Sequence, residues 1–150
     1  MLCERFVPRP AGGAGRAAGD LAHALTARGC TVDVLTAAAG GAPGRHRVAP
    51  RLQAIALPID EEPPGPRATR ELVSRLHDIV DLATVDVVHD NGGFFPALLP
   101  LSEQLRARCA APYLLQLQIQ WGPLLHIEGF DAATIARRVA GQRTLAALAD

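Results

Sequence analysis

The sequence contains no lysine, so all 15 of its basic residues are arginines. This absence excludes a Schiff-base lysine and the phosphate-binding lysine of a Walker-type loop. Asparagine occurs once, and aromatic residues make up only 4% of the chain. Ala, Gly, Pro and Arg are abundant instead, and we interpret this composition as a coding bias without a functional signal.

Cysteine is also scarce. Cys3, Cys30 and Cys109 lie far apart and lack the spacing of metal ligands. Their odd number argues against a disulfide framework and favours a reducing compartment. No apolar run approaches the roughly 20 residues that span a bilayer, and Met1–Arg5 is too short and too charged to begin a signal peptide. We therefore predict a cytoplasmic protein without a metal cofactor.

Charge is balanced along the chain. The 15 basic and 15 acidic residues give a formal net charge of zero. Without a dominant basic patch to neutralise phosphates, nucleic acid is not an expected partner. Peripheral contact with a membrane stays open.

The 150 residues, 49% of them apolar, fit one domain of ordinary size. Short apolar strands alternate with helical stretches, which predicts an α/β fold: a parallel sheet with helices on both faces and the strand order 3-2-1-4-5. The segment 37–51 has the composition of a loop. The predicted strands are 1–6, 31–36, 52–57, 85–89 and 113–118; the predicted helices run from a glycine-rich turn to a stop at Arg28–Gly29, then over 67–83, 95–109 and, after an N-cap at Asp131, up to residue 149.

A glycine-rich loop stands between the first strand and the first helix. Gly12 and Gly13 let the backbone approach a ligand closely, and the helix N-terminus, with Arg16 in its first turn, favours a phosphate. The spacing of Gly13, Gly15 and Ala18 also matches the G-x-G-x-x-A fingerprint of dinucleotide-binding enzymes. That match is weak, because two prolines precede the loop and no acid for a ribose follows the second strand. A structural turn without a ligand is the plain alternative.

A second candidate site follows the fourth predicted strand, where His89, Asp90 and Asn91 precede two glycines. Ligands of open α/β sheets bind beyond the carboxyl ends of the strands. We therefore expect this segment beside the Gly12–Gly13 loop at the carboxyl edge of the sheet. The alternative is a solvated turn in which Asp90 or Asn91 caps the next helix.

Three glutamines mark the fifth predicted strand and its exit. Strand alternation puts Gln116, Gln118 and Gln120 on one face. Glutamines buried in a strand need hydrogen-bond partners, so they either line a sugar-binding cleft or cap the end of the sheet.

Taken in order, these segments resemble the amino-terminal domain of family 4 glycosyltransferases. The family phrases are "PP-x-x-GG", "LA-x-x-L-x-x-RGH-x-V-x-V-x-T", "DVVH", "P-V-V-x-T-x-H" and a helix ending in "AD". Their counterparts here are residues 6–13, 21–36, 86–89, 112–118 and 145–150. The resemblance covers nearly the whole chain, and its specificity lies in the order and spacing of the phrases.

The resemblance implies the amino-terminal, Rossmann-like half of a GT-B fold. In such enzymes the amino-terminal domain mainly holds a sugar or lipid acceptor, and a carboxyl-terminal domain mainly holds the nucleotide-sugar, which is a co-substrate. They are usually retaining enzymes that need no catalytic metal. The residues that the resemblance and the two loops assign to substrate binding are Gly12, Gly13, Arg16, His89, Asp90, Asn91 and Gln118.

The chain departs from the family pattern in several places. Gln118, Ala17 and Asn91 stand where the family often has histidines, and glutamine cannot exchange protons as imidazole does. The chain also ends at Asp150, before the next strand of the family pattern. We expect one domain over residues 1–150, truncated at both ends, without a donor-binding domain and inactive alone.

Two other functions remain open. The chain is either a non-catalytic, Rossmann-like module that binds a sugar or a separate donor-binding domain, or, on the strength of the glycine spacing, a nucleotide-dependent oxidoreductase. Binding of a nicotinamide cofactor would favour the oxidoreductase.

Overall fold

The computed structural model describes residues 1–3, 6, 13–37, 43–57, 74, 76–91, 99–116 and 131–148. The chain divides into two compact units, Met1–Pro64 and Gly65–Asp150. The first unit contains α1 (Gly13–Ala27), β1 (Val32–Ala37), β2 (Gly44–Ala49) and β3 (Leu52–Leu57). The second contains α3 (Leu76–Ile79), the 3₁₀ helix η1 (Leu82–Thr84), β4 (Val88–Asn91), α4 (Leu99–Arg108), β5 (Tyr113–Gln116) and α6 (Ala132–Leu148).

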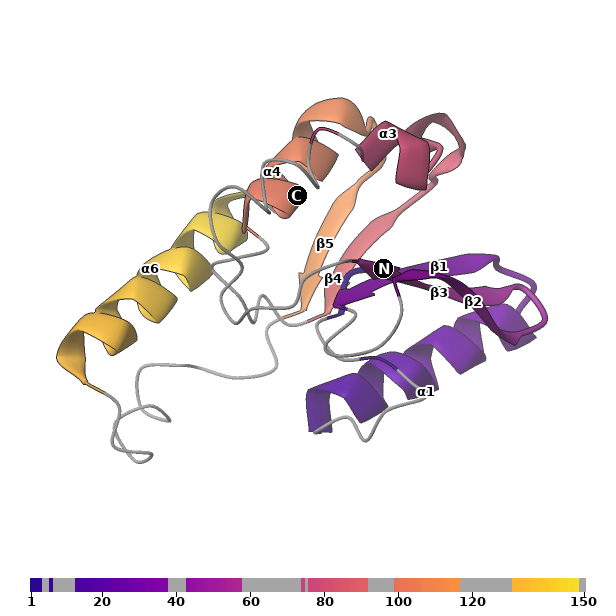
Figure 1. Ribbon diagram of the computed structural model, residues 1–150, viewed down its shortest axis with the longest axis horizontal. Coiled ribbons are helices and arrows are strands. Elements are labelled where there is room, and N and C mark those ends of the chain that lie inside the picture. The colour runs from indigo at the N-terminus through magenta and orange to yellow at the C-terminus, as the bar shows by residue number, and fades with distance from the viewer. Residues whose placement is uncertain are drawn as a thin grey trace. The chain divides into compact units, whose positions relative to one another are not determined.

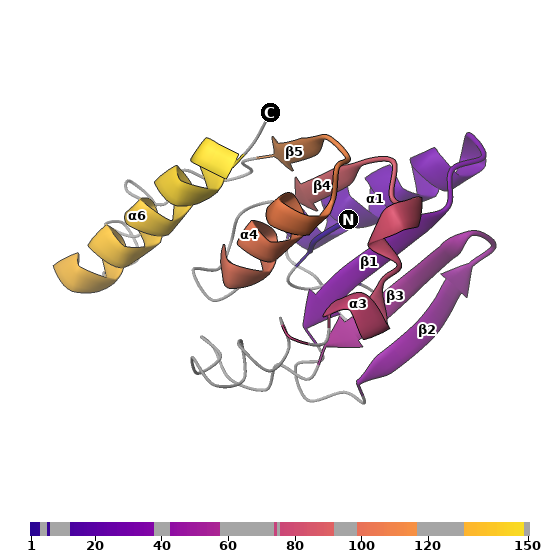
Figure 2. The ribbon, with the colours of Figure 1, turned by 90° about the horizontal axis from the view of Figure 1, so that it is seen from above.

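The sheet of the first unit has the order β1-β3-β2 (Figure 2). β1 and β3 are parallel, with Val32 opposite Leu52. The start of the chain extends this sheet on the free side of β1, where Leu2 forms a parallel bridge to Leu35. The Cys3 amide donates to the Leu35 carbonyl at 3.0 Å, and the Leu35 amide donates to the Met1 carbonyl at 2.8 Å. The predicted first and third strands therefore both neighbour the second, as the order 3-2-1 requires.

The prediction of a loop over 37–51 is wrong for Gly44–Ala49, which forms β2, an antiparallel partner of β3. Its first four residues, 44–47, are all exposed, and the segment has no alternating apolar pattern, so periodicity could not reveal this strand. The chain reverses tightly before β3 at Arg51, whose φ is 62°. The Arg51 guanidinium donates to the Gly29 carbonyl, which helps to hold this uncommon backbone conformation.

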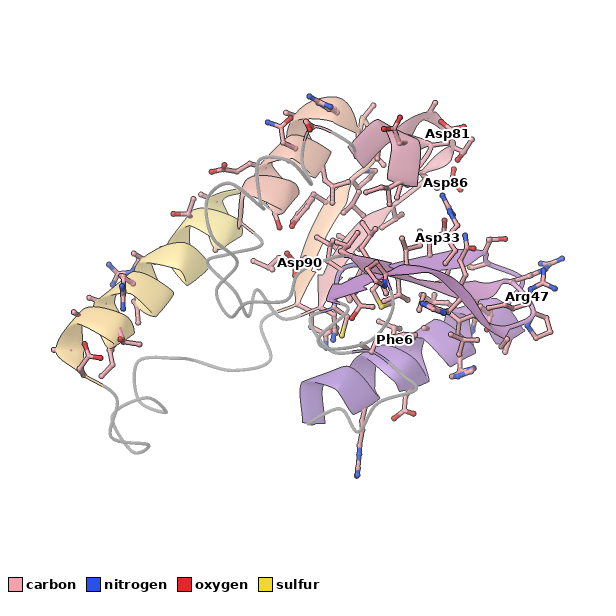
Figure 3. The ribbon with its side chains drawn as sticks, in the orientation of Figure 1. Phe6, Asp33, Arg47, Asp81, Asp86 and Asp90 are labelled. Atoms are coloured by element: carbon pink, nitrogen blue, oxygen red, sulfur yellow. The ribbon has the colours of Figure 1, made fainter. Side chains whose placement is uncertain are left out.

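α1 covers one face of this sheet (Figure 1). Ala18 and Ala22 of the helix are fully buried against alternate residues of the strands, because the side chains of a strand point to opposite faces in turn. Phe6 lies between the helix and the sheet, whereas Asp33 points away from the helix (Figure 3). The core cluster of this unit comprises Cys3, Phe6, Ala18, Ala22, Val32, Val34, Leu52 and Ala54.

α1 ends as the sequence predicts, at a glycine in the left-handed region. Gly29 has a φ of 92°. Its amide donates to the Thr26 carbonyl at 3.0 Å, and the Cys30 amide donates to the Leu25 carbonyl at 3.1 Å. This pair of bonds is the Schellman motif, which satisfies carbonyls that the last helical turn leaves without partners.

In the second unit, β4 and β5 are parallel, with Val88 opposite Tyr113. The predicted strand 85–89 is shifted: β4 begins at Val88 and includes Asp90 and Asn91, whereas the prediction ends the strand at His89. α4 packs near β5 and α6, and α6 contacts both (Figure 1). Pro100 occupies the first turn of α4, where proline is tolerated.

The N-cap predicted for the last helix is confirmed. Asp131 Oδ1 accepts from the Thr134 amide at 2.9 Å, and Asp131 Oδ2 accepts from Thr134 Oγ1 at 2.6 Å. These hydrogen bonds, those of the Thr134 side chain first, lower the pKa of Asp131. The start of α6 is therefore fixed by the residue that the sequence indicates.

The fold class is the predicted one: a Rossmann-like α/β arrangement of helices with sheets that contain parallel strands. The antiparallel β2 is the exception to the predicted all-parallel sheet. The 1-4 neighbourhood of the predicted strand order, and the position of the Gly12–Gly13 loop beside His89–Gly93, stay predictions. Of these residues Gly12, Gly92 and Gly93 lie outside the described part of the chain. In that part, no helix is both long enough and apolar enough to cross a membrane.

Two Gly→Ala substitutions should change stability in opposite directions. At Gly29 alanine would have to adopt a positive φ, so we expect Gly29→Ala to lower the free energy of unfolding by about 1 kcal/mol. At Gly19, in the middle of α1, a Cβ meets nothing within 4 Å, so we expect Gly19→Ala to raise it by about 0.5–1 kcal/mol. Urea unfolding followed by circular dichroism measures both. A Gly29→Ala chain as stable as the Gly19→Ala chain would contradict the Schellman ending.

Candidate functional site

The N-terminus of α1 is the first of the two predicted sites. Gly13 is the first helical residue, is exposed, and has open space where a Cβ would stand. Arg16 is exposed in the first turn, which contains no acidic residue. A helix N-terminus already favours an anion, and a cation in its first turn strengthens that preference. This end of α1 is therefore suited to an anionic group.

The glycine spacing of dinucleotide enzymes has a different setting here. Gly13, Gly15 and Ala18 all lie inside α1. β1 ends in Thr36 and Ala37, so no acid closes that strand. The acid that holds a ribose in dinucleotide-binding folds has no counterpart there.

The second predicted site lies at the carboxyl end of β4, and strand alternation divides its residues between two faces. Asp90 is on one face with Val88 and, across the register, Tyr113. His89 and Asn91 are on the other face, opposite Leu114 and Gln116 of β5. Asp90 and Asn91 are only 6% and 3% exposed, so the alternative of a solvated turn is wrong for these two residues.

Asp90 faces α4 and is held by two hydroxyl groups (Figure 3). Its Oδ2 accepts from Tyr113 Oη at 2.8 Å and from Ser102 Oγ at 3.2 Å. Tyr113 and Ser102 are themselves almost completely buried. A buried carboxylate without such partners would cost several kcal/mol. The three side chains therefore join β4, β5 and α4, and Asp90 fixes the end of β4 on the face that packs against α4.

The environment of Tyr113 acts on its hydroxyl as well. Burial, and next the negative charge of Asp90, raise the pKa of Tyr113 far above its ordinary value of 10.0. The phenol is thereby kept protonated as a donor to the carboxylate. Neither Tyr113 nor Ser102 is predicted as a site residue by the sequence; the signal would have been a phenol and a hydroxyl at buried positions near an acid.

His89 is half-buried on the face opposite Asp90. Burial lowers the pKa of His89, although the nearby charge of Asp90, and to a smaller extent the Gln116 side chain, act in the opposite direction. Its Nδ1 is buried and has no hydrogen-bond partner among the residues that the structure describes. Next to it, Leu114 is 47% exposed and Gln116 is exposed. This face therefore combines a neutral imidazole, two amides and an exposed apolar side chain.

The structure brings His89, Asp90 and Asn91 together at the end of β4, while Gly13 and Arg16 share the first turn of α1. Gly12 and Gln118 lie outside the described residues. No group of three or more His, Cys, Asp or Glu side chains stands close enough to hold a metal ion in the described ranges.

The class of protein that these features define is a Rossmann-like α/β domain with polar groups at the carboxyl end of a parallel strand pair. A family model described as "Glycosyl transferase 4-like domain" matches residues 12–150. The chain belongs to this family, as the resemblance in its sequence predicted. No curated protein and no solved structure gives a significant match.

Because Tyr113 is the only tyrosine of the chain, tyrosinate absorbance reports on it alone. The folded-state pKa is raised, so its contribution to stability is fully present below about pH 10 and is lost as the pH rises above that value. We expect the native chain to show no tyrosinate where the urea-unfolded chain titrates, near pH 10. Titration of both states at the same pH would contradict the buried hydrogen bond.

Removal of the phenol hydroxyl should destabilise the second unit. Tyr113→Phe deletes a hydrogen bond to a buried carboxylate, for which we expect a loss of about 1.5–3 kcal/mol in the free energy of unfolding. Ser102→Ala deletes the longer bond to the same oxygen and should cost less. Urea unfolding of the two variants gives the comparison, and a Tyr113→Phe chain of wild-type stability would show that Asp90 does not depend on this donor.

Proposed function

We propose that this domain forms the acceptor side of a glycosyltransferase that moves a sugar from a nucleotide-sugar to a sugar or lipid acceptor. The observation that carries the proposal is the match of the glycosyl transferase 4-like family over residues 12–150. The two faces of β4 support it, because the polar face with His89 and Asn91 is separate from the face that packs on α4.

In this proposal each site contributes a different kind of contact. The N-terminus of α1, with Gly13 and Arg16, approaches a phosphate, since it offers unpaired amides and a positive charge. The end of β4 offers hydrogen bonds to a substrate through His89 and Asn91. Gln118 is proposed as a further substrate contact where the family often has histidine. Positioning of acceptor against donor supplies much of the rate in such reactions, and we propose that donor binding requires a second domain.

The alternatives have less support. A nucleotide-dependent oxidoreductase would rest on the spacing of Gly13, Gly15 and Ala18, but all three lie within α1 and β1 ends without an acid. A non-catalytic sugar-binding or partner-binding module would share the fold and both sites. Activity, and not structure, separates that module from an enzyme.

The test is an assay of sugar transfer. The chain, alone and together with the products of the neighbouring coding sequences, is incubated with UDP-glucose or GDP-mannose and a panel of sugar and lipid acceptors. Mass spectrometry detects the glycosylated product, and NADH fluorescence detects cofactor binding in parallel. We expect transfer only in the combined samples. NADH binding without transfer would favour the oxidoreductase, and acceptor binding without transfer in any sample would favour the binding module.

A matched pair of alanine variants tests the role of α1. Gly13→Ala places a methyl group at the N-terminus of the helix, in open space, so the fold should tolerate it. If a phosphate approaches this backbone, the methyl group should weaken nucleotide-sugar binding about tenfold, the value of one lost hydrogen bond. Gly19→Ala makes the same chemical change at mid-helix and serves as the control. Calorimetric titration of each variant, in the combined sample that supports transfer, with the donor of that reaction measures both affinities; equal affinities would remove Gly13 from the site.

A further inference from the structure

Exposed arginines gather at one end of the first unit. This end is formed by the C-terminal end of α1, the start of β1 and the turn from β2 to β3 (Figures 1 and 2). Arg28 follows α1 directly, Arg51 lies in the turn, and Arg45 and Arg47 belong to β2, the last strand in the order β1-β3-β2. All four side chains are exposed. We call these four residues the arginine patch.

Contacts between separate segments bring the patch together. The Arg51 guanidinium donates to the carbonyl of Gly29, the residue after Arg28. Arg47 stands opposite Gln53, which follows Arg51 by two residues. The arginines are separated in the sequence, so the fold, and not a basic run in the chain, creates this concentration of charge.

The charge of the first unit is positive in its described part. That part contains five arginines against two acids, Asp20 and Asp33, which is an excess of three positive charges. None of the described acids forms an ion pair with Arg28, Arg47 or Arg51. The C-terminal end of α1 adds about half a negative charge, which is less than this excess.

The patch lacks the apolar residues on which protein partners anchor. Protein interfaces depend on aromatic and apolar side chains at their centre. The large apolar side chains that are exposed in the described part of the chain are Val87 and Leu114, and both belong to the second unit. Phe6, the aromatic residue described in the first unit, is buried and cannot stack on a base. A patch that offers positive charge alone fits a surface that is densely negative.

We propose that the arginine patch binds the headgroups of an anionic membrane surface, with the amino ends of β1 and β3 turned toward the lipid. This inference goes beyond the proposed function and does not depend on it. Because α1 has 15 residues, its N-terminus lies about 20 Å from this end. The proposed phosphate contact at Gly13 and Arg16 is therefore turned toward water, where a soluble nucleotide-sugar is found.

Sedimentation with lipid vesicles measures the binding. The full chain is mixed with vesicles of phosphatidylcholine that contain about 30% phosphatidylglycerol, or with vesicles of pure phosphatidylcholine. We expect binding to the anionic vesicles at about 50 mM salt and its loss near about 500 mM, because salt screens exposed charges. Absence of binding to the anionic vesicles, equal binding to both kinds, or binding that salt does not weaken would overturn the proposal.

Two double variants with the same change in net charge locate the binding surface. Arg28→Gln/Arg47→Gln removes two charges from the patch, and Arg137→Gln/Arg143→Gln removes two exposed charges from α6 in the second unit. At about fivefold per arginine, the first pair should weaken vesicle binding about 25-fold, and the second should leave it unchanged. All four side chains are exposed, so urea unfolding should match wild type. Equal losses in the two double variants would assign the binding to net charge and refute the patch.

An acidic protein or a nucleic acid is the alternative partner, and soluble polyanions test for it. Poly-glutamate and a random-sequence DNA duplex carry negative charge without a lipid surface. We expect both to bind more weakly than the anionic vesicles when compared at equal concentrations of negative charge. Tighter binding of either polymer than of the vesicles would overturn the membrane assignment.

Discussion

The buried carboxylate of Asp90 is the constraint on which the second unit depends. Its Oδ2 accepts hydrogen bonds from Tyr113 Oη and Ser102 Oγ, and these three residues come from β4, β5 and α4. Because an unpaired charge in this interior would be costly, the strand register and the position of the helix must satisfy the carboxylate together. A change in the register of one residue would turn Asp90 to the other face and leave both hydroxyls without their acceptor.

The same register determines what the opposite face presents. With Asp90 turned toward α4, His89 and Asn91 necessarily point the other way, beside Leu114 and Gln116. Burial keeps the imidazole uncharged by lowering its pKa, so the chemistry of this face is that of neutral hydrogen bonds. The face that carries Asp90 packs on α4, and the face that carries His89 is the one we propose for substrate contacts; a single residue of alternation separates the two.

The elements that could be predicted from the sequence are those whose ends or periodicity are determined by residues close together in the chain. The helix stop at Gly29 and the N-cap at Asp131 depend on contacts within one turn, and both are confirmed. β2 was missed because its pairing with β3, and not its own pattern, makes it a strand: Arg45, His46 and Arg47 are all exposed. The sequence predicted that His89, Asp90 and Asn91 form one site, but not that Asp90 lies on the opposite face from the other two. The partners that hold Asp90 there, Tyr113 and Ser102, lie 23 and 12 residues away in the chain. No local pattern reports contacts over such separations.

Each unit offers a different kind of contact, and this difference bears on the substrate. The first turn of α1 has exposed backbone, Arg16 and no acid, which suits an anion. Burial lowers the pKa of His89 on the β4–β5 face, and the other three residues of that face, Asn91, Leu114 and Gln116, carry no charge, so this face suits neutral hydrogen-bonding groups. A hydrogen bond between a neutral side chain and a hydroxyl group depends on the direction of approach, and this dependence makes recognition specific. A charged side chain, in contrast, would attract any anion. The proposed substrates are a nucleotide-sugar and its acceptor, which together contain an anionic diphosphate and sugar hydroxyl groups. A protein without lysine can bind both with helix amides, arginine and imidazole.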